Sequence, residues 1–253
     1  MIFTVVKNKI EIENMRKSGQ ILAHVLSTLS EKTSEGMSTK DIAEIAKSEL
    51  KPTGGLPTFL GYYGFPDVIC ISINDEIVHG IPRRNKIIKT GDIVSLDFGV
   101  TYNGMITDSA ISFIVGTPKN QADAELVKNT KRSLLKGISV LRDGVKVGDI
   151  SSSVQNVLDN YGYGIVRDLV GHGVGHELHE DPNIPNYGQK NTGPILKAGM
   201  TIAIEPMATL AGGKIVEDED GWTIRTADGS MSAHFEHTIL ITDDGYEILT
   251  QKT

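Results

Sequence analysis

Two aspartates of the sequence stand close together on one predicted β-hairpin, LDFGVTYNGMITDSAISF at residues 96–113. Asn103-Gly104 is typical of a two-residue hairpin turn, because both positions of a type I′ turn need a positive φ. Side chains alternate faces along a strand, so this turn puts Asp97 and Asp108 on one face as diagonal neighbours. The opposite face is apolar and is predicted to be buried.

Two carboxylates on one face repel each other unless a cation lies between them. The spacing suits a pair of metal ions, which two-metal hydrolases hold roughly 3.5–4 Å apart. For this hairpin alone, a solvated polar face is an equally good explanation. A second acidic pair favours the metal: MTIAIEP contains Glu205 at the end of a predicted strand, and SAHFEHTILIT places Glu236 within another.

An internal repeat relates the two acidic pairs. KTGDIVSLD, which ends at Asp97, aligns without gaps on KAGMTIAIE, which ends at Glu205, 108 residues later. Asp108 then corresponds to Glu236. The same shift carries five more residues onto identical ones: Gly36, Asp41, Ile42, Leu50 and Gly54 onto Gly144, Asp149, Ile150, Leu158 and Gly162. Helix starts and apolar strands could coincide by composition, but the common register favours a duplication.

The elements that must position these carboxylates repeat as well. Apolar spacing predicts a helix over residues 10–32, and a second helix begins near Ser38 or Thr39 and ends by Pro52. A loop rich in glycine and aromatic residues and a short strand follow. Two such halves predict an α+β fold with a pseudo-twofold axis, an antiparallel sheet and helices on one face. No stretch has linker composition, so residues 1–253 are predicted to form a single catalytic domain.

The segment VGHGVGHELHEDP supplies histidines to the acidic strands. Its glycines disfavour a helix and allow close approach of the backbone to a ligand. The His-Glu-x-x-His order of the zinc-protease helix is absent, so we reject that interpretation. Four carboxylates and His172 bring a charge of about −4, which two divalent cations neutralise. Oxygen-rich ligands favour Mn, Fe or Co, and the lone Cys70 excludes a cysteine-based structural zinc site.

The overall composition restricts the class of protein. The formal charge is −7, and no Lys- or Arg-rich stripe is present, so nucleic acid is not expected as the main ligand. The N-terminus lacks the apolar core of a signal peptide, and no run of about 18 apolar residues occurs, so we expect no membrane span. With a single cysteine, these features predict a cytoplasmic protein.

At these residues the chain resembles the methionine aminopeptidases, within the wider family that has the creatinase-like pita-bread fold. The resemblance covers essentially the whole chain and is strongest in CISINDEIVHGIP, GDIVSLDFG, GHGVGHELHEDP, MTIAIEPM and SAHFEHTILIT. The short stretch between His172 and Glu205 is similar to type I enzymes. The resemblance implies removal of the initiator methionine from nascent polypeptides when the second residue is small. It also implies a monomer that makes transient contact with the ribosome.

The resemblance implies a role for each candidate ligand. One divalent metal ion would be held by Asp97, Asp108 and Glu236. The second would be held by Asp108, His172, Glu205 and Glu236, with a bridging water or hydroxide as the nucleophile. Glu205 would also shuttle a proton.

Further residues match the family outside the ligand set. His79 and His179 would be catalytic and would contact the substrate without binding metal. The methionine pocket would be lined by Tyr62, Phe65, Cys70 and Trp222. Asn74 and Ser232 match a monovalent-cation site. Leu178 and Phe65 depart from the aromatic and Tyr residues that are common at their positions, which leaves the fine specificity open.

Two alternatives remain at this level. A proline-specific peptidase of the same fold would use much the same metal ligands, but such enzymes usually carry an N-terminal domain for which this chain has no room. A metal-free binding protein on this fold would be expected to have lost ligands, and none of the five is missing here.

Overall fold

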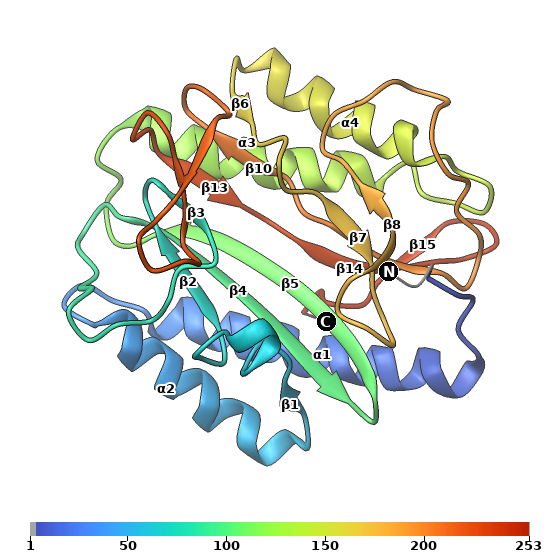
Figure 1. Cartoon of the computed structure of the whole chain (residues 1–253), viewed down its shortest axis with the longest axis horizontal. Coiled ribbons are helices and arrows are strands. Elements are labelled where there is room, and N and C mark those ends of the chain that lie inside the picture. Colours follow the sequence, from blue (N-terminus) through green and yellow to red (C-terminus); the bar gives the residue numbers. More distant parts are fainter. Residues whose placement is uncertain (1–3, 253) are drawn as a thin grey trace.

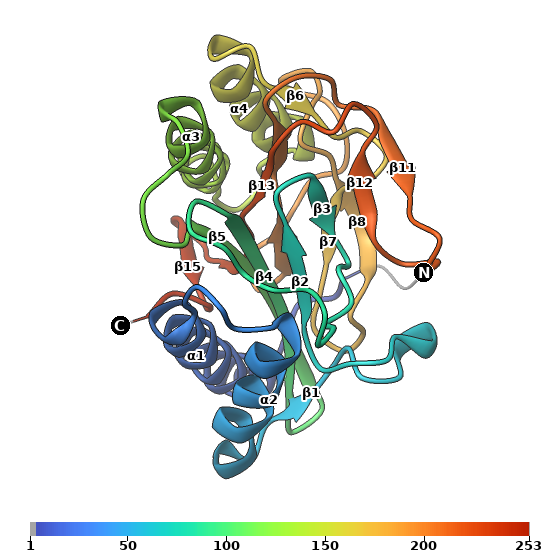
Figure 2. The same cartoon turned by 90° about the vertical axis from the view of Figure 1, so that its left-hand side faces the viewer.

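The computed structural model describes residues 4–252, and its four helices lie on one side of the strands (Figure 1, Figure 2). The helices are α1 (Lys9–Lys32), α2 (Thr39–Leu50), α3 (Gln121–Ile138) and α4 (Val147–Asn160). The first two agree with the predicted helices. Ser38 is the N-cap of α2, and its side chain exchanges hydrogen bonds with Asp41 in a capping box. The polar residues read from the sequence as helix starts therefore mark real ends.

The first half of the chain contains a four-stranded antiparallel sheet of β1 (Leu56–Pro57), β2 (Cys70–Ile73), β4 (Ile93–Tyr102) and β5 (Met105–Ile114). The strand β3 (Glu76–Val78) belongs to another sheet. The predicted hairpin is confirmed: Tyr102 pairs with Met105 across the Asn103-Gly104 turn, and both turn residues have positive φ. The loop between α2 and β2 also contains two short 3₁₀ turns, Lys51–Thr53 and Tyr62–Gly64.

The second half builds a five-stranded sheet in the order β15-β14-β9-β7-β8, and β13-β10-β6 form a three-stranded one. These strands are β6 (Gly164–Ile165), β7 (Gly171–Gly173), β8 (Glu180–Ile184), β9 (Thr201–Ile204), β10 (Met207–Thr209), β13 (Ser232–His234), β14 (His237–Ile241) and β15 (Tyr246–Ile248). A hairpin of β11 (Ile215–Glu217) and β12 (Ile224–Thr226) pairs with β3 of the first half.

Each half buries its own apolar core under its pair of helices. One cluster joins α1 and α2 to β2 and β4 and includes the fully buried Leu96 and Phe98. The other joins α3 and α4 to β9 and β14 and includes Ile202 and Ile239. Burial of such side chains is worth about 1.5–3 kcal/mol each, so each helix pair is held on the sheet mainly by its apolar face. Asp97 alternates with Leu96 and Phe98 along β4, so its carboxylate lies on the opposite face of the sheet.

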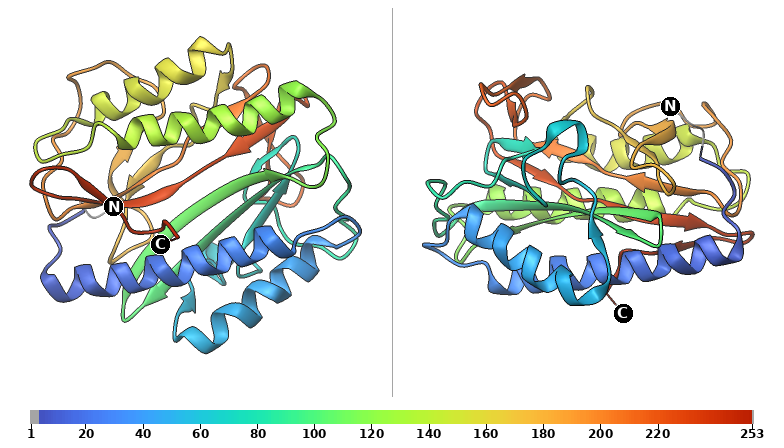
Figure 3. Two further views of the ribbon diagram at one scale, coloured as in Figure 1. Left: turned by 180° about the vertical axis from the view of Figure 1, so that it is seen from behind. Right: turned by 60° about the horizontal axis from the view of Figure 1, so that its bottom comes forward.

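The predicted repeat is visible in hydrogen bonds related by the same shift. The amide of Gly36 donates to the carbonyl of Ile88, and 108 residues later the amide of Gly144 donates to Leu196, both at 2.9 Å. The shift also superposes the start of α2 on that of α4. The two helix pairs therefore cover the same face of the strands, one pair over each half, as Figure 3 shows from behind. The axis between the halves is where equivalent side chains meet.

None of the helices in residues 4–252 combines the length and the apolar composition that crossing a bilayer requires.

Candidate metal centre and substrate pocket

The hairpin brings two carboxylates to the axis between the halves. Asp108 on β5 pairs with Gly99 on β4, and Asp97 pairs with Ala110, so the predicted register is confirmed. Both carboxylates are buried, with 8% of Asp97 and 5% of Asp108 exposed. Asp97 also lies opposite Cys70 of β2. The acidic face of this hairpin is therefore enclosed by protein and is not a solvated surface.

Glu236 reaches the same place in a way that the sequence did not predict. The expected continuous strand through SAHFEHTILIT is wrong, because the chain breaks between β13 and β14 at Phe235-Glu236. At the break, Glu236 forms an isolated bridge with Ala110 of the hairpin. The amide of Glu236 donates to Ala110 at 2.9 Å, and the Ser109 hydroxyl donates to the Glu236 carbonyl at 2.6 Å. Pairing with the other half thus directs the Glu236 side chain into the site.

The second half adds Glu205, directly after β9, and His172 on β7. Nε2 of His172 lies 3.5 Å from a carboxylate oxygen of Glu205. On the other side of the ring, Nδ1 lies 2.9 Å from the carbonyl of Gly173. A carbonyl oxygen only accepts, so Nδ1 carries the proton and Nε2 keeps its lone pair. This is the tautomer that a metal-binding histidine needs.

The ligand atoms of Asp108, His172 and Glu236 all lie within 4.8 Å of one another, which suits a shared metal ion. Buried carboxylate oxygens of Asp97, Asp108 and Glu236 accept no hydrogen bond from the residues that the structure describes. Burial raises the pKa of Asp97 to about 7. Burial, together with neighbouring carboxylates, also raises the pKa of Glu236. Clustered, unpartnered carboxylates of this kind fit divalent cations, whose charge would stabilise the ionised form.

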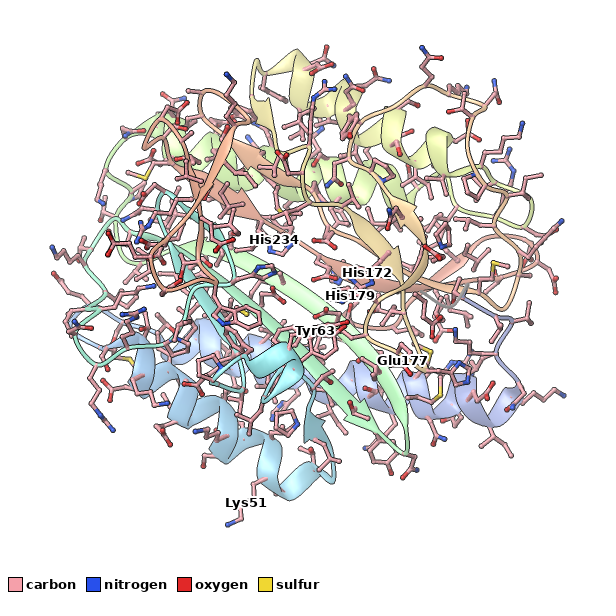
Figure 4. The ribbon with its side chains drawn as sticks, viewed as in Figure 1. Lys51, Tyr63, His172, Glu177, His179 and His234 are labelled. Carbon is pink, nitrogen blue, oxygen red and sulfur yellow. The ribbon has the colours of Figure 1, made fainter. Side chains whose placement is uncertain are left out.

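Two further histidines flank the acidic cluster. His79 follows β3 with a φ of +58°, which is uncommon for a residue with a side chain. Burial lowers its pKa to about 4, so its ring is neutral near pH 7. The ring of His179 lies 4.5 Å from that of His172, measured between centroids (Figure 4). Nδ1 of His179 lies 2.9 Å from the hydroxyl oxygen of Tyr62.

All eleven candidate site residues line one cavity of about 210 Å³. One end is formed by the five proposed ligands, and the other end is apolar. In the apolar end, the rings of Phe65 and Trp222 meet edge to face at 5.1 Å. Cys70 is buried, and burial raises the pKa of its thiol, so it presents a neutral sulfur to the cavity. The structure thus joins an acidic, metal-type end to an apolar end lined by aromatic rings.

Sequence reasoning missed two lining residues and one neighbour of the cavity. Phe59 and Tyr63 also line the cavity, and the aromatic run TFLGYYGF was the available signal for them. His234 is fully buried, and its Nε2 lies 3.7 Å from Glu205. Neither ring nitrogen of His234 has a hydrogen-bond partner among the described residues. Alternation in SAHFEHT could have grouped His234 with Glu236.

The two residues of the expected monovalent-cation site lie together. The amide and the hydroxyl of Ser232 both lie 2.8 Å from the backbone carbonyl of Asn74. Asn74 has a φ of +61°, and its side-chain oxygen accepts a hydrogen bond from the amide of Ile93. The cation itself stays a prediction.

Known proteins share both the sequence and the geometry of this chain. The model of metallopeptidase family M24 matches residues 13–243. A methionine aminopeptidase of Clostridium acetobutylicum is 44% identical over 97% of this chain and 98% of its own. The crystal structure of methionine aminopeptidase from Thermotoga maritima has a TM-score of 0.97 and 44% identity. That match covers 99% of this chain and 100% of the other.

A prolidase from Pyrococcus furiosus shares the fold more distantly, with a TM-score of 0.79 and 26% identity. The match covers 99% of this chain but 66% of that one. These similarities confirm the expected pita-bread fold and a metallopeptidase that uses divalent metal. The chain belongs to metallopeptidase family M24, in its group of methionine aminopeptidases.

Proposed function

We propose that this chain removes the initiator methionine from nascent polypeptides whose second residue is small. One observation carries the proposal: a cavity of about 210 Å³ joins a cluster of metal-type ligands to an apolar end lined by aromatic rings. Drug-sized ligands occupy pockets of roughly 300–1,000 Å³, so this cavity suits a single side chain beside a reacting bond. The geometry supports an exopeptidase that holds one terminal residue.

Two divalent cations, for which we propose Mn, Fe or Co, would be held by Asp97, Asp108, His172, Glu205 and Glu236. When bound, they would lower the pKa of a water molecule, which would supply a hydroxide nucleophile for the peptide carbonyl near neutral pH. The unpartnered oxygens of Asp97, Asp108 and Glu236 support this assignment. Asn74 and Ser232 would add a monovalent cation nearby. We assign residues 1–253 to one catalytic domain.

The protein's own groups would bind and orient the substrate and move protons. Nδ1 of His179 is engaged by the Tyr62 hydroxyl, so Nε2 on the opposite side of the ring would donate to the carbonyl oxygen of the scissile bond. The neutral ring of His79 would contact the scissile nitrogen. Glu205 would accept a proton from the attacking water and return it to the departing amine.

The apolar end would select methionine. A thioether is polarizable and packs well against aromatic rings, here those of Tyr62, Phe65 and Trp222, with the Cys70 sulfur beside them. The free N-terminal amine would lie near the carboxylates, which can accept its hydrogen bonds. We further propose that the enzyme works as a cytoplasmic monomer that meets its substrates by transient contact with the ribosome.

Peptide hydrolysis tests the proposal. The purified protein, with added Mn or Co, should release methionine from Met-Gly-Met-Met and leave Gly-Pro and Arg-Pro peptides intact. Chelation should abolish the activity, and restored metal should return it. Preferential cleavage of the proline peptides would instead identify a proline-specific peptidase, and absence of any metal-dependent hydrolysis would reject an enzymatic role.

A further inference from the structure

The side wall of the apolar pocket is carried by a surface loop. Trp222 lies in residues 218–223, which connect β11 to β12 in a hairpin that extends from the body of the molecule (Figure 2). Its ring contacts Phe65. Because β12 pairs with β3, Ile224 lies opposite Val78, next to His79. The position of this loop therefore affects the shape of the pocket that would receive the first side chain of the substrate.

The loop is organised around one carboxylate, that of Asp220. One oxygen accepts hydrogen bonds from the amides of Trp222 at 2.9 Å and Thr223 at 2.8 Å. The other accepts from the Thr223 hydroxyl at 2.8 Å and from the guanidinium of Arg83 at 3.0 Å. Burial alone would raise the pKa of Asp220, but these hydrogen bonds outweigh it and lower the pKa to about 2. The carboxylate is therefore ionised at any working pH.

Arg83 brings a second segment of the chain to this loop. It stands four residues after His79, and its amide donates to the Thr39 hydroxyl at 2.8 Å, which anchors it to the start of α2. The same hydroxyl donates to the Arg83 carbonyl at 3.1 Å. Arg225 makes another link to the His79 segment, since it binds Asp75 at 3.0 Å and Glu76 at 2.9 Å besides Asp218 at 2.8 Å. The Arg83–Asp220 pair is a separate tie, which acts at Asp220, two residues before Trp222, and not on β12.

We propose that Arg83 and Asp220 form a positioning pair that holds Trp222 against the methionine pocket and thereby sets selectivity for the first side chain. The selectivity part rests on the function proposed above. Without the pair, the hairpin would still be attached to the His79 segment through β12 and Arg225, but residues 218–223, which carry Trp222, would lose their direct link to Arg83. The pocket would then accept other unbranched or branched apolar side chains more readily.

The pair lies in a polar cleft of about 600 Å³ that is lined by residues including Glu76, Lys86 and Arg225. About 47% of the Arg83 side chain is exposed, against 13% for Asp220. Salt screens the attraction between solvent-exposed charges, so the ion pair of Arg83 with Asp220 should hold the loop less firmly at high ionic strength. The hydrogen bonds that Asp220 makes inside its own loop should persist.

The test compares Arg83→Met and Asp220→Asn with a matched control, Arg84→Met, in the metal-loaded enzyme. Arg84 is adjacent, is 74% exposed and pairs with Asp41 at 3.6 Å, away from the loop. Trp222 is the only tryptophan in the chain, so quenching of its fluorescence by acrylamide measures how exposed this ring is to solvent. Steady-state kinetics on Met-Gly and Leu-Gly peptides measure the selectivity of the pocket for the first side chain.

We expect Arg83→Met to raise KM for Met-Gly peptides about threefold to fivefold, with kcat within about twofold, as suits a partly exposed ion pair. The ratio of kcat/KM for Met over Leu should fall by a similar factor, and quenching should increase. Asp220→Asn should show larger changes in the same direction, and Arg84→Met none. High salt should increase quenching in the parent protein but not in Arg83→Met.

Unchanged selectivity and unchanged quenching in Arg83→Met would overturn the proposal. If Asp220→Asn fails to fold, Arg83→Met and the salt series still decide it. A parent enzyme that cleaves no methionine peptide would reject the proposed function and with it the selectivity, while the quenching result would still show whether the pair holds the loop.

Discussion

The hydroxyl oxygen of Tyr62 lies 2.9 Å from Nδ1 of His179 and joins two segments that are 117 residues apart. Tyr62 belongs to a 3₁₀ turn, and His179 directly precedes β8. Their rings are also close, with centroids 5.6 Å apart. The contact fixes the orientation of an imidazole that lines the cavity, so it bears on how that ring meets a substrate.

Replacing Tyr62 with Phe should therefore impair turnover more than binding. Loss of one hydrogen bond is worth about 0.5–1.5 kcal/mol, so kcat should fall roughly threefold to tenfold while metal content stays the same. Tyr246→Phe is the control, because Tyr246 is 41% exposed and belongs to β15, outside the lining of the cavity. Equal kcat values for the two variants would show that the Tyr62 hydroxyl does not orient His179.

Replacing Glu205 or Asp97 with Ala should abolish metal-dependent turnover and leave a folded protein. Each change removes a proposed ligand from a cluster whose charge two cations neutralise. Metal analysis, circular dichroism and peptide hydrolysis together check this. Asp123→Asn provides a control at another buried carboxylate. Full activity of Glu205→Ala in the presence of chelator would disprove the dinuclear mechanism.

Replacing His79 or His179 with Ala should leave both metal equivalents bound and lower mainly kcat. Removal of a positioned acid, base or oxyanion contact typically costs about 10²-fold or more. Titration calorimetry with Mn, alongside steady-state kinetics, separates the two effects. If either variant lost one metal equivalent, that histidine would be a ligand and its assignment here would be wrong.

Asp97 should make the metal-free protein lose stability as the pH rises, because its carboxylate is buried. Burial raises the pKa of Asp97 from 3.8 to about 7. The folded state therefore keeps a proton that the unfolded chain releases, and that contribution is lost between about pH 4 and pH 7. Asp97→Asn removes this titration, and the histidines titrate in both proteins.

In the presence of chelator, the Tm of Asp97→Asn should therefore exceed that of the parent protein by a margin that grows with pH and levels off above about pH 7. Excess MnCl₂ should reverse the order, because the cation stabilises the ionised carboxylates. A pH-independent difference in Tm would show that ionisation of Asp97 does not destabilise the metal-free protein.

The enzyme should cleave Met-Gly, Met-Ala and Met-Ser peptides much faster than Met-Lys or Met-Phe. A clash of about 3 kcal/mol beyond the first residue suffices for a difference of about 10²-fold in kcat/KM. Formylated or acetylated methionine should resist cleavage, because the blocked amine loses its charge and gains bulk. A panel of Met-X peptides measures this. Equal kcat/KM for Met-Gly and Met-Phe, or efficient release of Leu or Pro, would contradict the proposed selectivity.

The register of the acidic hairpin could be read from the sequence because short-range rules determine it. Asn103-Gly104 tolerates the positive φ that a two-residue turn needs, and alternation then places Asp97 and Asp108 on one face. The start of α2 was equally accessible, since Ser38 and Asp41 satisfy the first amides of the helix locally. The repeat extended these local rules to the second half.

The tertiary structure alone decided how the two halves meet. The strand break at Glu236 depends on its bridge to Ala110, a residue of the other half. The position of His234 beside Glu205 and the pair of Arg83 with Asp220 arise from contacts between separate segments. Residue type and local period determine turns, caps and faces, because their partners lie within a few residues. Contacts between residues more than 100 positions apart depend on how the two halves pack against each other, and no local sequence pattern encodes that packing.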